Sequence, residues 1–277
     1  MPPPSDVRRV LAPGLRVVRR GRDLLQVGLY DGRRALLPRT PTVEQVLADL
    51  LARRPVPEDP EPLAVLETLE RSGCLAPDPL LAPVHGPVAL LGGWPPERLG
   101  TPDPGGLLRG CGLRVTPWVS RAAVVLVLSA GELAREVLDP LLRARTAHVV
   151  VRLVDGGAVL GPFVAPGETA CLRCVDAHLG VEDPHHVVVT ERYVRASGRS
   201  RGDGVPDVGD PALAALALAW GVREVGAYLR GQRPAAWSRT LELGAEPSRV
   251  VDRSWPRHPE CGCCWAAHAP LSGTMEA

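Results

Sequence analysis

Lysine is absent from this chain of 277 residues, and so are asparagine and isoleucine. Every basic side chain apart from histidine is therefore an arginine. The missing lysine excludes a Schiff-base lysine, the lysine of a P-loop and the catalytic lysine that adenylating enzymes use. The chain therefore cannot carry out reactions that require a lysine amine.

Long apolar runs and a strong net charge are lacking as well. The longest apolar stretches, Ala122–Gly131 and Ala212–Gly221, are shorter than a membrane span, and the start of the chain lacks the apolar core of a signal peptide. The net charge of +1 creates no overall field for nucleic acid or an anionic membrane. We therefore expect a cytoplasmic globular protein with neither as a partner.

The first part of the chain predicts short strands followed by helices. Turn signals separate three expected strands, which are Leu15–Arg20, Asp23–Tyr30 and Arg33–Pro38. Thr40 or Thr42 is suited to cap a helix with apolar residues at helical spacing, and a second helix runs from Leu63 to a closing Gly73. Residues 1–82 are thus expected to form a small α+β winged-helix domain, with Leu75–Pro87 as linker.

The rest of the chain, residues 83–277, alternates between strand and helix patterns and predicts an α/β domain. The expected strands are Pro87–Gly93, Leu113–Val119, Ala122–Gly131, a pair within 147–167, and two late strands within 238–244 and 247–255. The expected helices are Glu132–Thr146 and Pro211–Arg230.

Two groups of cysteines indicate a metal site. Cys171 and Cys174 form one C-x-x-C pair, and Cys261 and Cys264 form another, with Cys263 as an alternative to Cys264. Two such pairs can supply four thiolates to one tetrahedral zinc ion, and a full thiolate set leaves no open position for catalysis. We therefore expect structural Zn²⁺; a redox role for the first pair, or inert thiols, are the alternatives.

A glycine-containing turn follows the first strand of the second domain, but it is poorly suited to phosphate. Gly92, Gly93 and Gly100 do not have the spacing of a dinucleotide-binding loop, and Pro95 and Pro96 remove two amide donors. No acidic residue ends the following expected strand. A plain strand-to-loop turn is the favoured interpretation, and no bound ATP is expected.

The segments "GPFVAPGETACLRCVDAH" and "HPECGC", together with the glycine turn and the apolar strand before Ser129, resemble the ThiF/MoeB-type adenylating fold of the ubiquitin-activating superfamily. The resemblance covers about residues 87–265. It is greatest to the divergent ocin-ThiF-like branch, whose members partner YcaO cyclodehydratases in azoline (TOMM and thiopeptide) RiPP biosynthesis.

The departures from the adenylating pattern concern the nucleotide. Ser129 and Ala130 stand in the region where adenylating members carry an Asp-rich segment, and the lysine is absent. The resemblance therefore implies a degenerate domain, an accessory protein rather than an enzyme. The rival interpretation is a ThiF-like ATP-dependent adenylyltransferase with an atypical nucleotide site. Because the ThiF fold often dimerises, a homodimer stays open.

The first domain is similar to the PqqD-like peptide-recognition element of such proteins, a winged helix of three strands and three helices. This similarity implies that the leader of a precursor peptide adds a strand beside the third strand and rests on the last helix. The implied contact residues are Arg33, Arg34, Ala35, Leu36, Leu37, Leu63, Leu66, Glu67 and Glu70. The alternative is that these leucines fill a small core and the arginines are solvated.

Overall fold

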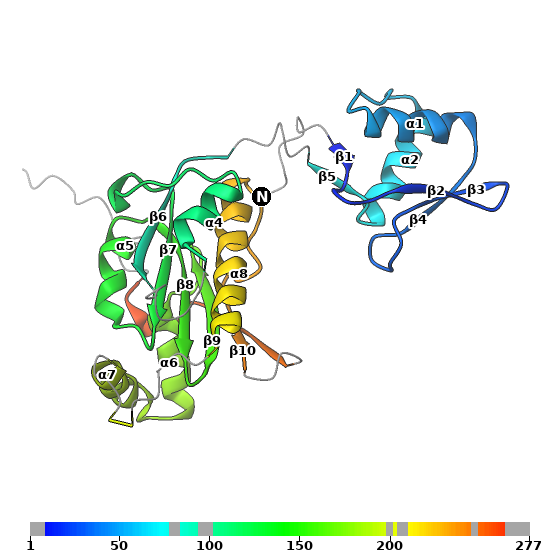
Figure 1. The fold of residues 1–277 in the computed structure, drawn as a ribbon. Coiled ribbons are helices and arrows are strands. Elements are labelled where there is room, and N and C mark those ends of the chain that lie inside the picture. Colours follow the sequence, from blue (N-terminus) through cyan, green and yellow to red (C-terminus); the bar gives the residue numbers. More distant parts are fainter. Residues whose placement is uncertain are drawn as a thin grey trace, which may run out of the picture. The chain divides into compact units, whose positions relative to one another are not determined.

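The structure is a computed structural model that describes residues 9–77, 84–93, 102–197, 202–203, 210–244 and 249–263. The chain divides into two compact units, Met1–Pro83 and Val84–Ala277 (Figure 1). Each unit has its own hydrophobic core. They are described separately below.

The N-terminal unit is built from a three-stranded antiparallel sheet and two helices. The sheet has the order β2-β3-β4 and consists of β2 (Val17–Arg20), β3 (Leu24–Val27) and β4 (Ala35–Pro38). The helices are α1 (Pro41–Leu51) and α2 (Pro60–Arg71). A separate antiparallel pair joins β1 (Arg9–Leu11) to β5 (Leu75–Pro77).

Local sequence explains these elements. The hydroxyl of Thr40 accepts a hydrogen bond from the amide of Val43, as expected for an N-cap, and Gly73 follows α2 with a φ of 62°. Along β4 the side chains alternate, with Ala35 and Leu37 buried against the helices. The three strands and both helices predicted for this part are confirmed.

The pair β1–β5 was not predicted, and the linker assignment is wrong at its start. Leu75–Pro77 pairs with Arg9–Leu11, and the backbone carbonyl of Cys74 accepts a hydrogen bond from Ala12. Such a pairing joins residues more than sixty positions apart, and a run of three residues carries no strand periodicity of its own. In the described part of this unit the structure has two helices rather than the three of the PqqD-like pattern.

The C-terminal unit contains a six-stranded mixed sheet with the order β11-β10-β9-β8-β7-β6. Strands β6, β7 and β8 are parallel to one another, whereas the pairs β8–β9, β9–β10 and β10–β11 are antiparallel. Their bounds are β6 (Val88–Gly93), β7 (Val124–Ala130), β8 (Ala147–Val154), β9 (Gly157–Val164), β10 (Arg239–Leu243) and β11 (Val250–Ser254).

Helices cover both faces of this sheet. On one face lies α8 (Pro211–Leu229), and Gly221 allows its close approach, since a Cβ there would lie 2.8 Å from Val151. The other face carries α5 (Asp139–Arg143) and α6 (Leu172–Glu182). Two further helices are α4 (Pro104–Gly110) and α7 (His186–Ser197). Among the described helices, α8 alone is long and apolar enough to cross a membrane, and half of its most apolar window is buried inside the protein.

Two predictions for this unit need correction, and three helices were not predicted. Leu113–Val119 is not a strand: Val115 makes a single parallel bridge to Val88, and the amide of Trp118 donates to the hydroxyl of Thr116 instead of continuing the pairing. The segment Glu132–Thr146 forms a 3₁₀ turn (Arg135–Leu138) and the short α5 instead of one helix. Helices α4, α6 and α7 were not predicted.

Candidate functional site

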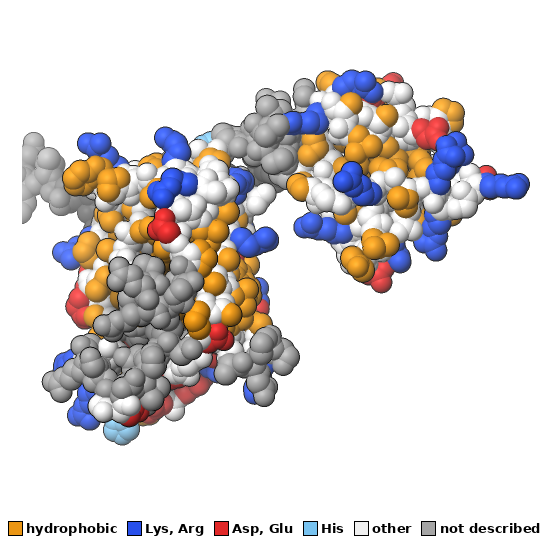
Figure 2. All heavy atoms as spheres, viewed as in Figure 1, with side chains coloured by type: hydrophobic (Ala, Val, Ile, Leu, Met, Phe, Trp, Pro, Cys, Tyr) orange, Lys and Arg blue, Asp and Glu red, His pale blue; other side chains and the backbone are white. Residues whose placement is uncertain are grey.

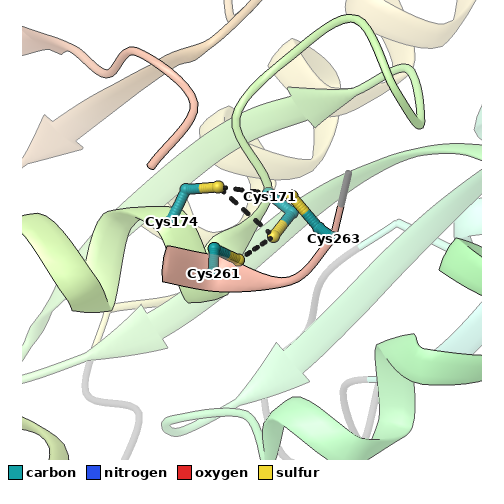
Figure 3. Close-up of side chains that lie close together, drawn as sticks. All are labelled: Cys171, Cys174, Cys261 and Cys263. Atoms are coloured by element: carbon teal, nitrogen blue, oxygen red, sulfur yellow. Dashed lines mark hydrogen bonds between the residues drawn. The ribbon is translucent and has the colours of Figure 1, made fainter. Parts of the chain in front are cut away.

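Cysteine side chains from two distant segments meet beside the sheet. Cys171 is the N-cap of α6, and Cys174 lies in its first turn. Cys261 ends the 3₁₀ turn Pro259–Cys261, and Gly262, with a φ of 75°, turns the chain so that Cys263 follows on the same side. Figure 3 shows the four side chains pointing toward one another.

The sulfur positions suit one tetrahedral metal ion. The Sγ–Sγ distances are 3.8 Å for Cys171–Cys174, 3.4 Å for Cys171–Cys261 and 3.5 Å for Cys174–Cys263, and all four sulfurs lie within 4.8 Å of one another. Zinc about 2.3 Å from four tetrahedral sulfurs separates them by about 3.8 Å. A disulfide needs about 2.05 Å. The cluster can therefore hold a metal ion, and its thiolate chemistry fits zinc.

The C-terminal cysteines are held in place by the segment that precedes them. The indole of Trp255 donates a hydrogen bond to the hydroxyl of Thr240 on β10, at 2.8 Å. A ring nitrogen of His178 on α6 lies 3.0 Å from the carbonyl oxygen of Pro256, and Arg257 donates to the carbonyl of Gly167 at 2.6 Å. These hydrogen bonds hold the segment beside α6 without the help of a metal ion.

Burial and proximity also affect the thiols. Cys171 and Cys174 are almost fully buried, whereas Cys261 and Cys263 are half-buried. Hydrogen bonds from the neighbouring thiols, that of Cys171 first, lower the pKa of Cys174 because they stabilise its thiolate. A thiolate is the form that a metal ion requires. Cys264, predicted with Cys263 as its alternative, lies outside the described residues.

A second polar cluster lies between the sheet and α6. The carboxylate of Glu132 accepts hydrogen bonds from Arg152 on β8, at 2.6 and 2.7 Å, and pairs with Arg135. Arg135 in turn donates two hydrogen bonds to Asp176 on α6, both at 2.7 Å. The four side chains are only 9–13% exposed. We call them the ionic cluster.

The ionic cluster is electrostatically balanced. Burial alone would raise the pKa of Glu132, but Arg152 and Arg135 outweigh it and lower the pKa to about 2. The guanidinium groups are therefore engaged by carboxylates. A hollow of about 500 Å³ lies beside the cluster, and its lining includes Arg135, Asp176, Arg173, Val187, Val194 and Cys261.

The region expected to disfavour a nucleotide is only partly described. Gly92 and Gly93 belong to β6 and pair with Leu128 and Ser129 of β7. A Cβ at Gly92 would lie 2.3 Å from the carbonyl oxygen of Leu128, so this glycine is needed for the close approach of two strands. Pro95, Pro96 and Gly100 lie outside the described residues.

The residues expected to contact a peptide fall on different surfaces of the N-terminal unit. Ala35 and Leu37 are buried in its core. Leu36 projects from the opposite face of the sheet, 43% exposed, and Leu63 on α2 is 41% exposed. The other members lie as follows: Arg33, Arg34, Glu67 and Glu70 are exposed, Leu66 is half-buried, Arg34 pairs with Asp31, and Glu70 pairs with Arg9.

The ionic cluster was missed by sequence reasoning. Glu132, Arg135, Arg152 and Asp176 come from three separate segments, and charged residues in such segments usually lie on solvated faces. One signal was available, because Arg152 interrupts the apolar pattern of β8 at a position whose neighbours are all buried.

Comparisons with known proteins bear on this architecture. No family model and no curated protein matches the chain. The heterocyclase TruD has a TM-score of 0.62 at 16% identity, over 97% of this chain and 45% of its own. A heterocyclase in complex with substrate and cofactor has a TM-score of 0.61 at 17% identity, over 96% of this chain and 41% of its own. MccB of E. coli with ATP has a TM-score of 0.57 at 14% identity, over 93% of this chain and 99% of its own.

The chain shares the fold of these proteins. The fold of the heterocyclase and MccB structures extends over nearly the whole chain, and the expected mixed α/β architecture is confirmed. The chain spans less than half the length of the two heterocyclase chains. At these identities the likeness concerns the fold alone, and the role of each site residue needs its own argument.

Proposed function

We propose that this chain is a non-catalytic protein of RiPP biosynthesis that binds the leader of a ribosomal precursor peptide. It delivers that peptide to a YcaO cyclodehydratase in the cytoplasm for azoline formation. One observation carries the proposal: the likeness to a heterocyclase spans 97% of the chain and thus includes both units. A related heterocyclase structure contains substrate.

The peptide is proposed to bind at the edge of β4 beside α2, the arrangement of a PqqD-like element. In the described sheet β4 pairs on one side with β3 and is the last strand of the order β2-β3-β4, so its other edge can accept a further strand. Leu63 supplies an exposed apolar side chain on α2. Ala35 and Leu37 support this edge from inside the core rather than by contact.

The cysteine cluster is proposed to bind structural Zn²⁺. Four thiolates close the coordination shell, so the ion would join α6 to the segment after β11 and leave no position for substrate. Cys171, Cys174, Cys261 and Cys263 are the proposed ligands.

The test is binding of a fluorescent leader peptide, measured by anisotropy, from a precursor encoded beside a YcaO gene. We expect saturable binding that Leu63→Asp weakens by about tenfold, the effect of losing a buried apolar contact and adding a desolvated charge. Leu51→Asp is the matched control, because Leu51 is an exposed leucine on α1. Absence of saturable binding to the wild-type chain would overturn the proposal.

Adenylation is the second candidate, because the likeness includes a structure of MccB with ATP. Against it stand the missing lysine and the engagement of Arg135 and Arg152 by carboxylates. Calorimetry with Mg-ATP and a pyrophosphate-exchange assay distinguish the two. Turnover that depends on this chain would favour the adenylyltransferase.

A further inference from the structure

The outer face of the N-terminal sheet, turned away from α1 and α2, is apolar and exposed. Val18, Gln26 and Leu36 are direct cross-strand neighbours, so they form one row on this face. The alternate row, which includes Val27 and Ala35, is buried against the helices. Exposed fractions are 51% for Val18, 39% for Leu24, 43% for Leu36, 68% for Leu29 and 79% for Tyr30.

A hollow of about 750 Å³ opens on this face. Its lining includes Arg16, Val18, Gln26, Leu29, Tyr30 and Arg33. At the floor of the hollow the backbones of Gly28 and Arg33 approach each other closely. Gly28 has a φ of 77°, and a Cβ there would lie 1.9 Å from the carbonyl oxygen of Arg33. Gln26 is oriented by its own hydrogen bonds, donating to the carbonyl of Gly28 at 2.8 Å and accepting from Arg20 at 3.1 Å.

Charge is divided between the two sides of the unit. Residues 12–39, which form the sheet, contain seven arginines and two aspartates, a net charge of +5. Residues 40–77, which contain both helices, have three arginines and seven acidic residues, a net charge of −4. Arg16 and Arg33 have no carboxylate partner among the described residues, although both line the hollow. Figure 2 shows one side of this unit, on which blue side chains lie around orange ones and a few red side chains lie among them.

This division decides where an acidic ligand would bind. Near α2, a negative side chain meets Glu67 and Glu70, whereas on the outer face it meets unpaired guanidinium groups beside apolar side chains. Asp31 also lines the hollow, but it is paired with Arg34. Single exposed apolar residues are ordinary, but a group of them beside unpaired guanidinium groups is typical of a binding surface.

We propose that the outer face of the sheet binds an acidic segment of the precursor peptide that carries carboxylates and apolar side chains on the same face of its extended chain. The carboxylates pair with Arg16 and Arg33, and the apolar side chains rest on Val18, Leu29 and Tyr30. This inference rests on the proposed peptide-binding function. It adds a second contact surface and the chemistry of the segment that this surface selects.

The experiment uses the full chain and a labelled synthetic peptide in which pairs of glutamates alternate with pairs of leucines, so that each face of the extended peptide carries both residue types. Its control is the same peptide with glutamine in place of glutamate. We expect Arg33→Glu to weaken binding of the glutamate peptide by about tenfold, since a hydrogen bond between charged groups is lost and a like charge takes its place. Tyr30→Ala should weaken binding of both peptides by a few-fold, because in the proposed complex the ring of Tyr30 packs on the leucine side chains that both peptides share.

Arg71→Glu is the matched charge control, since Arg71 lies on α2 and the change in net charge is the same. If Arg33→Glu and Arg71→Glu weaken binding of the glutamate peptide equally, overall charge explains the effect and the inference is overturned. Equal binding of the glutamate and glutamine peptides would also overturn it, because the carboxylates would then not be recognised. Tighter binding of polyuridylate than of the glutamate peptide would overturn it in favour of nucleic acid. Leader binding that ignores Arg33 and Tyr30 would refute this surface but leave the proposed function standing, whereas absence of any leader binding would refute both.

Discussion

The two units of this chain place their distinctive side chains in opposite environments. In the N-terminal unit, arginines and apolar side chains gather on an exposed sheet face around a hollow. In the C-terminal unit, the thiols of α6 and the ionic cluster are buried between the sheet and its helices. Exposed groups without partners are available to a ligand, whereas buried groups that engage one another hold segments together. We therefore expect substitutions in the first unit to alter binding and those in the second to alter stability.

The tryptophans make this comparison measurable. All six lie after residue 93, in the C-terminal unit. Tryptophan emission during denaturation therefore follows that unit alone, and hydrogen exchange in α1 follows the N-terminal unit.

The largest effect is expected from Cys174→Ser. Loss of one of four thiolates removes most of a structural zinc ion's contribution, which is about 10 kcal/mol or more. We expect the C-terminal unit to lose its cooperative unfolding transition and about one equivalent of zinc per chain, measured by metal analysis and tryptophan emission. Cys111→Ser is the control, because Cys111 is exposed and outside the cluster. Leader binding by the N-terminal unit should persist.

The same measurement identifies the fourth ligand. If Cys263 binds the metal, Cys263→Ser loses zinc and Cys264→Ser retains it. The reverse result would assign Cys264. Metal-free wild-type protein that unfolds at the same denaturant concentration would contradict a structural role for the ion.

Glu132→Gln should have the next largest effect. It leaves Arg135 and Arg152 buried without the carboxylate that they share, and breaking such a pair costs about 3–5 kcal/mol. Denaturant titration followed by tryptophan emission measures the change in the free energy of unfolding. Glu136→Gln is the control: its side chain is 75% exposed and it should change stability by less than about 1 kcal/mol. Equal effects would mean that the ionic cluster does not stabilise this unit.

The buried His148 should give the C-terminal unit a distinct pH dependence. Burial lowers the pKa of His148 from 6.5 to about 4, so the folded chain keeps this ring neutral while the unfolded chain protonates it. Above pH 6.5 this residue does not reduce the free energy of unfolding. As the pH falls from 6.5 to 4, the free energy of unfolding decreases, and below pH 4 it is lower by roughly 3 kcal/mol. Compared with wild type, His148→Leu should flatten the stability curve across that interval. An unchanged slope would assign the pH dependence to other groups.

The smallest effect concerns the N-terminal unit. Thr40→Ala removes the hydroxyl that caps α1 and should lower the stability of this unit by about 1 kcal/mol. Hydrogen exchange in α1 should become faster, while zinc content and tryptophan unfolding stay unchanged. Thr42→Ala is the control, because Thr42 lies inside the first turn and its hydroxyl, within the described part of the chain, bonds only to Glu61 on the neighbouring helix. A change in tryptophan unfolding would show that the two units are energetically coupled.

Sequence reasoning recovered elements with strong local signals. The strands of the N-terminal sheet, the Thr40 cap, the apolar core strand β7 and the long helix α8 all follow from periodicity and turn chemistry within short windows. It failed where pairing is long-range or periodicity is weak. The β1–β5 pair is too short to show alternation, and α7 has no buried residue to produce an amphipathic stripe.

The sequence by itself determined that soft thiolate ligands exist in two groups, that lysine chemistry is excluded, and that helices and strands alternate after a small α+β unit. Only the tertiary structure decided that Cys171, Cys174, Cys261 and Cys263 meet within 4.8 Å, that Glu132 joins two arginines, and that Leu36 and Leu37 face opposite sides of one sheet. The physical reason is distance. Composition and local periodicity fix which groups are available, but their contacts depend on the packing of segments up to ninety residues apart.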